Sequence, residues 1–139
     1  MKKYDCLFIG NAIVDIVANA SFEFLKEQNI DVGSWRPTKL DEISQLQNKM
    51  KDTLVASGGS AANSAVGFSF LGGKSSFIGR VKDDEFGQLY IKDLQDANVD
   101  FVSSAVKEGD ETGRCLVYVT PDAQRSMRTY LGAASNLSP

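Results

Sequence analysis

The sequence predicts an α/β fold, in which a mostly parallel sheet has helices on both faces and a small separate β-sheet lies apart from it. Short unbroken apolar runs such as residues 6–9 are typical of parallel strands that are covered on both sides. These runs alternate along the chain with segments of helical periodicity. Residues 112–120 and 125–131 break this alternation, because they are two β-prone segments joined by a Pro-Asp turn.

The first part of the chain supplies a strand, a β-branched segment and two short helices. Gly10 ends the first apolar run, and Asp15 is the single acid inside the β-branched segment that follows. Ser21 has a side chain suited to capping a helix, and Ile43 and Leu46 lie at helical spacing. In order, the predicted elements are a strand at 6–9, an extended segment at 13–18, a helix at 22–28, a short extended segment within 29–38, a helix at 39–51 and a strand at 53–56.

The second part begins at Gly58-Gly59, which separates a short strand from a helix rich in small residues. Two adjacent glycines permit a backbone with positive φ and the close approach of a ligand. Asp83 or Asp84 is placed to cap a later helix. In order, the predicted elements are a helix at 61–71, strands at 75–79 and 99–102 around a helix at 85–97, and a hairpin formed by 112–120 and 125–131.

The composition excludes several classes of function. The 139 residues carry a net charge of −3, and their basic residues are scattered, which argues against a nucleic-acid surface. The absence of histidine removes the commonest general base and most zinc sites. No apolar run approaches the ~20 residues that span a bilayer, and the N-terminus is a poor signal peptide. We therefore expect a cytoplasmic protein that binds neither nucleic acid nor membrane.

Two phosphate-binding motifs are absent. Gly72-Gly73-Lys74-Ser75 resembles the end of a P-loop, but Phe68 stands where that motif needs its first glycine. The Lys-Ser pair also follows a helix and enters a strand, which is the reverse of the order in a P-loop. No G-x-G-x-x-G exists, which weakens the alternative of an unrelated Rossmann-type nucleotide enzyme.

Five residues form the candidate site. They follow the predicted first strand or lie at the Gly-Gly turn, and ligands bind outside the carboxyl ends of strands in α/β sheets. A carboxylate accepts charge-assisted hydrogen bonds from neighbouring hydroxyls, so this set favours a polyol or ribose. The alternative is an outward-turned aspartate and a merely structural turn. The five residues are Asn11, Asp15, Gly58, Gly59 and Asn63.

Longer motifs surround these residues. Residues 58–65 read GGSAANSA, Leu71-Gly72 follows, and residues 77–87 read FIGRVKDDEFG. Together they closely resemble the first signature of the PfkB (ribokinase-like) carbohydrate kinases. Residues 10–16 resemble the family's first substrate-binding segment, and residues 112–115 and 124–127 resemble lid strands of its adenosine-kinase-like and related sugar-kinase members. Lys82 stands where the signature usually has glycine, so we expect a change in loop geometry there.

The resemblance implies a three-layer α/β/α fold with a small β lid, whose strands fall at about 12–18, 33–38, 112–120 and 125–131. The rest of the chain, including the strand at 53–56, is expected in the α/β core. It implies ATP-dependent phosphorylation of a primary hydroxyl of a sugar or nucleoside, with Mg²⁺. By similarity, Asp15, Gly59 and Asn63 hold the substrate with Asn11 and Gly58 beside them, and Arg125 reaches toward phosphate from the lid.

The family's second motif, which carries the catalytic aspartate, has no match in this sequence, and family members are roughly twice as long. We therefore expect no catalytic residue in this chain and expect it to be the N-terminal, substrate-side part of a kinase, unable to catalyse alone. The ATP and Mg²⁺ sites are expected mostly outside it. The alternative is a non-catalytic binding or dimerisation module that keeps the sugar site. A homodimer through the β lid is a further expectation from the family.

Overall fold

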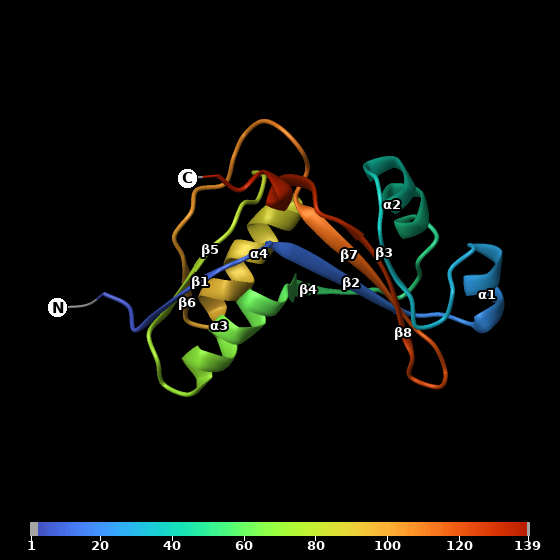
Figure 1. Ribbon diagram of the computed structural model, residues 1–139, viewed down its shortest axis with the longest axis horizontal. Coiled ribbons are helices and arrows are strands. Elements are labelled where there is room, and N and C mark those ends of the chain that lie inside the picture. The colour runs from blue at the N-terminus through green and yellow to red at the C-terminus, as the bar shows by residue number, and fades with distance from the viewer. Residues whose placement is uncertain (1–2, 139) are drawn as a thin grey trace. The chain divides into compact units, whose positions relative to one another are not determined.

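The computed structural model describes residues 3–138, which form two compact units (Figure 1). Of the described residues, the first unit comprises 3–14, Ala56–Gly113 and 131–138. The second unit comprises Asp15–Val55 and Arg114–Tyr130. The chain therefore crosses between the units four times.

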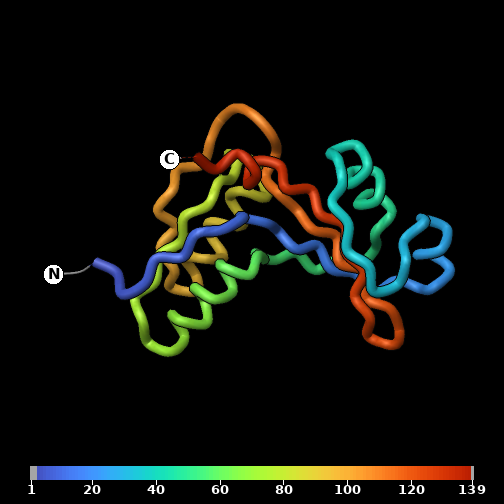
Figure 2. Tube along the Cα trace, in the orientation of Figure 1, coloured from blue at the N-terminus to red at the C-terminus, as the bar shows by residue number. Residues whose placement is uncertain are grey.

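The first unit is built on a three-stranded parallel sheet. Its strands are β1 (Cys6–Ile9), β5 (Ser75–Ile78) and β6 (Val99–Phe101), in the order β1-β5-β6. Strands β1 and β5 are far apart in sequence and lie side by side in the trace (Figure 2), with Phe8 opposite Phe77. All of its strand pairs are parallel. The parallel sheet expected from the apolar runs is therefore confirmed.

Two helices cover one face of this sheet. Helix α3 (Ser60–Phe70) places Phe68 against Phe8, with ring centroids 5.9 Å apart. Helix α4 (Glu85–Asp96) places Tyr90 against the fully buried Phe77, at 6.0 Å. Because Phe8 and Phe77 are partners across β1 and β5, both helices lie on the same face. Leu7 and Ile9 of β1 alternate with Phe8 and point to the second face, where both are exposed, so no helix within residues 3–138 covers them.

Asp84 caps the N-terminus of α4 and connects the helix to Thr112, the residue before β7. Its Oδ1 accepts hydrogen bonds from Gly87 N and Thr112 Oγ1, at 2.8 and 2.7 Å, and its Oδ2 accepts from Thr112 N at 2.9 Å. Of the two predicted caps, Asp84 is thus the one used. Lys82 keeps its backbone outside the left-handed region, so a lysine fits at this signature position without strain.

The second sheet has five strands in the order β3-β8-β7-β2-β4. Strands β7 and β8 form the predicted antiparallel hairpin, with Cys115 opposite Thr129. The short strand β3 pairs with β8 in parallel, with Trp35 opposite Met127. The bounds are β2 (Ile13–Asn19), β3 (Trp35–Pro37), β4 (Leu54–Gly58), β7 (Gly113–Val119) and β8 (Arg125–Tyr130).

Two short helices and a 3₁₀ turn complete the chain. Helix α1 is Phe22–Glu27, helix α2 is Leu40–Gln47, and the 3₁₀ segment η1 is Gly132–Asn136. Ser21 caps α1 as predicted, because its side chain accepts from Phe24 N at 3.1 Å. Helix α2 ends before the predicted residue 51. Asn48 closes it, and the next two amides, Lys49 N and Met50 N, donate to carbonyls three residues back, so the backbone after Asn48 forms turns and no longer an α-helix.

One strand lies in a different sheet from the one expected. The sequence places residues 53–56 in the α/β core, whereas β4 is an edge strand of the five-stranded sheet. Leu54 is 76% exposed, and Val55 is also exposed. A strand covered on both faces would bury these side chains, so the apolar run at this position reflects an uncovered edge and not a core strand. Among residues 3–138, no helix is both long and apolar enough to cross a bilayer.

Candidate functional site

The Gly58-Gly59 turn joins the end of β4 to the start of α3. Gly59 has φ 92° and ψ 132°, a conformation that is nearly restricted to glycine. A Cβ at this position would lie 2.7 Å from the backbone oxygen of Asn11. The turn and the segment after β1 therefore approach each other more closely than any residue with a side chain would permit.

Two side chains of helix α4 hydrogen-bond to the backbone on the strand side of this turn. The hydroxyl of the fully buried Tyr90 donates a hydrogen bond to Gly58 O at 3.2 Å. Ser57 N donates to Asp93 Oδ2 at 2.8 Å. Two side chains from successive positions on one face of α4 thus fix the backbone on the strand side of the turn, and such fixed backbone is a preorganised surface for a polar ligand.

The side chains beside the turn are exposed. Asn63 lies in the first turn of α3, where its backbone N–H donates to Gly59 O at 2.9 Å. Its side chain and that of Asn11 are both exposed to solvent. The first unit therefore brings together four predicted site residues: Asn11, Gly58, Gly59 and Asn63.

The other two predicted residues, Asp15 and Arg125, belong to the second unit. Asp15 is half-buried on β2, and burial raises the pKa of its carboxyl, while the charge of Arg125 opposes that shift. Arg125 is exposed at the start of β8. The two side chains thus act on each other electrostatically from strands of the same sheet, with the carboxylate partly desolvated and ready to accept hydrogen bonds.

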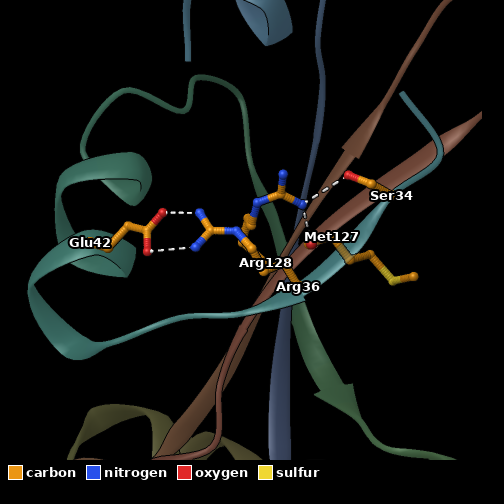
Figure 3. Close-up of polar contacts among 5 residues, drawn as sticks. All are labelled: Ser34, Arg36, Glu42, Met127 and Arg128. Carbon is orange, nitrogen blue, oxygen red and sulfur yellow. Dashed lines mark hydrogen bonds and ion pairs between the residues drawn. The ribbon is translucent and has the colours of Figure 1, made fainter. Parts of the chain in front are cut away.

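One face of the five-stranded sheet is packed against helices. We call it the covered face. Tyr118 contacts Phe24 of α1 at 5.8 Å between ring centroids, and Arg114 Nη2 donates to Ser44 Oγ of α2 at 3.0 Å. On the same face, Arg128 donates to Ser34 Oγ at 3.1 Å and to a backbone oxygen (Figure 3).

Arg36, which is opposite Arg128 in the register, forms a two-pronged ion pair with Glu42 of α2 (Figure 3). Glu42 lies in the first turn of α2, and its carboxylate points toward Arg36 of β3 (Figure 3). These contacts attach α2 to the sheet, so the basic residues of the covered face serve packing. Asp15 lies on the opposite face of the sheet, together with Arg125.

The opposite face, which we call the open face, carries Asp15 and the alternate residues of the hairpin. Cys115 and Thr129 are partners there, and Thr129 Oγ1 donates to Cys115 Sγ at 3.2 Å. Burial raises the pKa of the Cys115 thiol, the hydrogen bond with Thr129 opposes that shift, and the charge of Asp15 adds to it. Trp35 Nε1 donates to Thr129 Oγ1 at 3.0 Å.

Sequence reasoning did not identify three residues that support or extend the site. Tyr90 and Asp93 fix the Gly-Gly turn, but the periodicity of α4 shows Tyr90 only as part of an apolar face. Trp35 projects from a three-residue strand whose facing is set by its pairing with β8. Within residues 3–138, no cluster of three acidic or cysteine side chains forms a metal site.

Both the sequence and the structure are similar to those of known proteins. Residues 27–139 match the model of the pfkB family of carbohydrate kinases. A probable chloroplastic fructokinase-6 of Arabidopsis thaliana is 37% identical over 82 residues, which is 59% of this chain and 21% of that protein. A fructokinase of Escherichia coli is 38% identical over 84 residues, which is 60% of this chain and 27% of that protein.

Solved structures match over nearly the whole chain. An adenosine kinase from Sinorhizobium meliloti is 40% identical with a TM-score of 0.91, covering 99% of this chain and 42% of that one. A probable sugar kinase from Rhizobium etli is 36% identical with the same TM-score, covering 100% and 42%. The chain therefore spans less than half the length of these relatives.

These solved relatives share the ribokinase-like α/β arrangement described above, which confirms the fold that the motifs indicate. The family model covers the Gly58-Gly59 turn, Asn63 and the whole hairpin. The chain belongs to the pfkB family of carbohydrate kinases.

Proposed function

We propose that the protein containing this chain transfers the terminal phosphoryl group of ATP to a primary hydroxyl of a sugar or nucleoside. The observation that carries the proposal is the Gly58-Gly59 turn. It is closed onto Asn11, held by Tyr90 and flanked by the exposed Asn63, in a chain that belongs to a carbohydrate-kinase family. Such a turn suits a neutral, hydroxyl-rich ligand that exchanges hydrogen bonds with fixed backbone and amide groups.

Each of the remaining residues has a role that its chemistry supports. The Asp15 carboxylate accepts hydrogen bonds from two neighbouring hydroxyls, and its partial burial makes those bonds stronger than they would be in water. Asn63 offers both a donor and an acceptor. Asn11, Gly58 and Gly59 position the acceptor molecule beside the start of α3.

Phosphoryl transfer needs positioning and charge stabilisation more than covalent chemistry by the protein. ATP with Mg²⁺ supplies the phosphoryl group and neutralises charge on it. Because the family's second motif, which carries the catalytic aspartate, has no match in this sequence, we place that aspartate and most of the ATP site in a part of the protein outside this chain. Arg125, exposed on the same sheet as Asp15, is our candidate for a phosphate contact.

The test is a kinase assay on the full-length protein with ATP and a panel of fructose, ribose and ribonucleosides. We expect turnover of at least one of them. Asp15→Asn should raise the KM for that substrate about 10- to 100-fold, because a hydrogen bond to a charged acceptor is worth about 1.5–3 kcal/mol. Asp41→Asn is the control, since Asp41 is an exposed carboxylate on α2. An unchanged KM for Asp15→Asn would contradict its assigned role.

One observation favours self-association as an additional role. Strand β4 is an edge of its sheet, and its Leu54 and Val55 side chains are exposed. An uncovered apolar edge strand pairs readily with a second copy. We propose a homodimer through this sheet, to be checked by analytical ultracentrifugation of the parent and Leu54→Lys. Two identical monomeric profiles would argue against it.

A further inference from the structure

A cavity of about 350 Å³ lies within the second unit, among the end of β2, helix α1 and the turn that follows α2. Its lining includes Ala18 of β2 and Tyr118 of β7. Tyr118 contacts Phe24 of α1 and so belongs to the covered face. Ala18 is three residues along the strand from Asp15, which places the two on opposite faces. The cavity is therefore separate from the candidate substrate site.

Two ammonium groups line this cavity without a carboxylate partner. Lys49 and Lys51 belong to the turn after α2, which is closed by the backbone bond from Lys49 N to a carbonyl three residues back. The Lys49 ammonium donates to the neutral amide oxygen of Gln28, at the end of α1. Within residues 3–138, neither lysine forms an ion pair, and no aspartate or glutamate lines the cavity. The local charge therefore favours an anionic ligand.

The hydroxyl of Tyr118 is a buried donor without an acceptor. The side chain is 1% exposed, and its oxygen has no hydrogen-bond partner among residues 3–138. Burial raises the pKa of this phenol to about 12, against the opposing charge of Arg128, so the group keeps its proton at neutral pH. A buried hydroxyl left unpaired destabilises a folded protein. A ligand oxygen that reaches it through a small displacement of the cavity wall would supply the missing acceptor.

The remaining wall is largely apolar. Phe24 and Met50 are half-buried there, and the Phe24 ring lies 5.8 Å from the ring of Tyr118 at a tilt of 44°. A volume of about 350 Å³ is at the lower end of the range for small-molecule sites. The cavity therefore suits a compact ligand whose flat apolar body packs on these side chains, and it suits a bare inorganic anion poorly.

We infer that this cavity binds a small organic anion with an aromatic body, whose charged oxygens accept hydrogen bonds from Lys49, Lys51 and Tyr118. The aromatic body lies against Phe24 and Met50. The site is on the opposite face of the sheet from Asp15, and it does not rest on the proposed kinase function.

The test is isothermal titration calorimetry of the full-length protein with salicylate as the probe. Salicylamide, which lacks the charge, and inorganic phosphate, which lacks the ring, should each bind at least about tenfold more weakly. Replacing both Lys49 and Lys51 with Gln should raise the Kd for salicylate about three- to twentyfold, since each exposed ion pair contributes up to about fivefold. Replacing both with Arg should keep the Kd within about twofold.

The matched control replaces Lys26 and Lys39 with Gln, which removes the same charge from exposed residues of the same unit that do not line the cavity. That control should bind salicylate with nearly the affinity of the parent. The inference is wrong if salicylate does not bind, or if the Kd is the same for the parent and for the variant without Lys49 and Lys51.

Two single variants locate the bound anion. Tyr118→Phe keeps the ring and should raise the Kd about tenfold or more, while its Tm without salicylate should equal or exceed that of the parent. A Tm lower by several degrees would mean that the hydroxyl is already paired inside the protein, which contradicts its role as a free donor. Asp15→Asn should leave the Kd for salicylate within about twofold. Loss of binding in that variant would place the anion at the substrate site and overturn the inference.

Discussion

Substituting Gly59 with alanine should both destabilise the protein and weaken substrate binding. Alanine at φ 92° and ψ 132° carries a backbone strain of about 1–3 kcal/mol. The added Cβ would also meet the Asn11 backbone oxygen at 2.7 Å, and a backbone atom moves only together with its chain. We therefore expect a loss of about 2–4 kcal/mol in the free energy of unfolding, which is a large share of a typical total.

The measurement is urea denaturation of the full-length protein, followed by the KM for the best substrate. Gly67→Ala is the matched control, because Gly67 lies within α3 and no atom lies within 4 Å of its Cβ position. That change should stabilise the helix by about 0.5–1 kcal/mol. If Gly59→Ala were as stable as the parent and kept its KM, the close approach of the turn to Asn11 would have no importance for this protein.

Three further changes probe the groups around the site. Asp15→Asn should raise the free energy of unfolding at neutral pH. Burial raises the pKa of Asp15 in the folded state above its ordinary value of 3.8, so ionisation of the carboxyl destabilises the folded protein as pH rises from 3.8 through the folded-state pKa. In urea denaturation at a series of pH values, the extra stability of Asp15→Asn should therefore vanish below pH 3.8. Tyr90→Phe removes the donor to the Gly58 carbonyl and should cost about 1–2 kcal/mol in denaturation while raising KM; a loss of stability with KM unchanged would limit Tyr90 to packing. Thr112→Val breaks two hydrogen bonds at Asp84 and Lys82 and should cost about 1–3 kcal/mol, whereas Thr112→Ser should retain most of that stability in the same assay.

Local patterns in the sequence were sufficient for most elements of the fold. The apolar runs at β1 and β5 predict parallel strands, and the Pro-Asp turn predicts the β7–β8 hairpin, because each signal lies within a few residues of the element it specifies. The exception is β4. Its apolar residues resemble a core strand, yet which sheet a strand joins depends on partners far away in the chain.

The candidate site also contains residues that local sequence patterns identify and residues whose placement depends on distant parts of the chain. Gly58-Gly59 and Asn63 are contiguous in sequence, so their grouping follows from one turn and one helix. The closeness of Asn11 to that turn depends on tertiary packing, although the position of both segments at strand ends indicates it. Tyr90 and Asp93 act on the turn through a helix about thirty residues later, and no local pattern distinguishes a hydroxyl that holds a carbonyl from one that merely fills a core.

Trp35 shows why the last part of the site requires the structure. In a strand, neighbouring side chains point to opposite faces, so a shift of one residue in the pairing of β3 with β8 would move the indole to the covered face. There it would compete with α2 for the space that Arg36 and Glu42 now occupy. The ion pair of Arg36 with Glu42 and the hydrogen bond of Trp35 to Thr129 both favour the observed register from opposite faces. The contacts that attach α2 to one face of the sheet therefore also keep the indole on the face that carries Asp15.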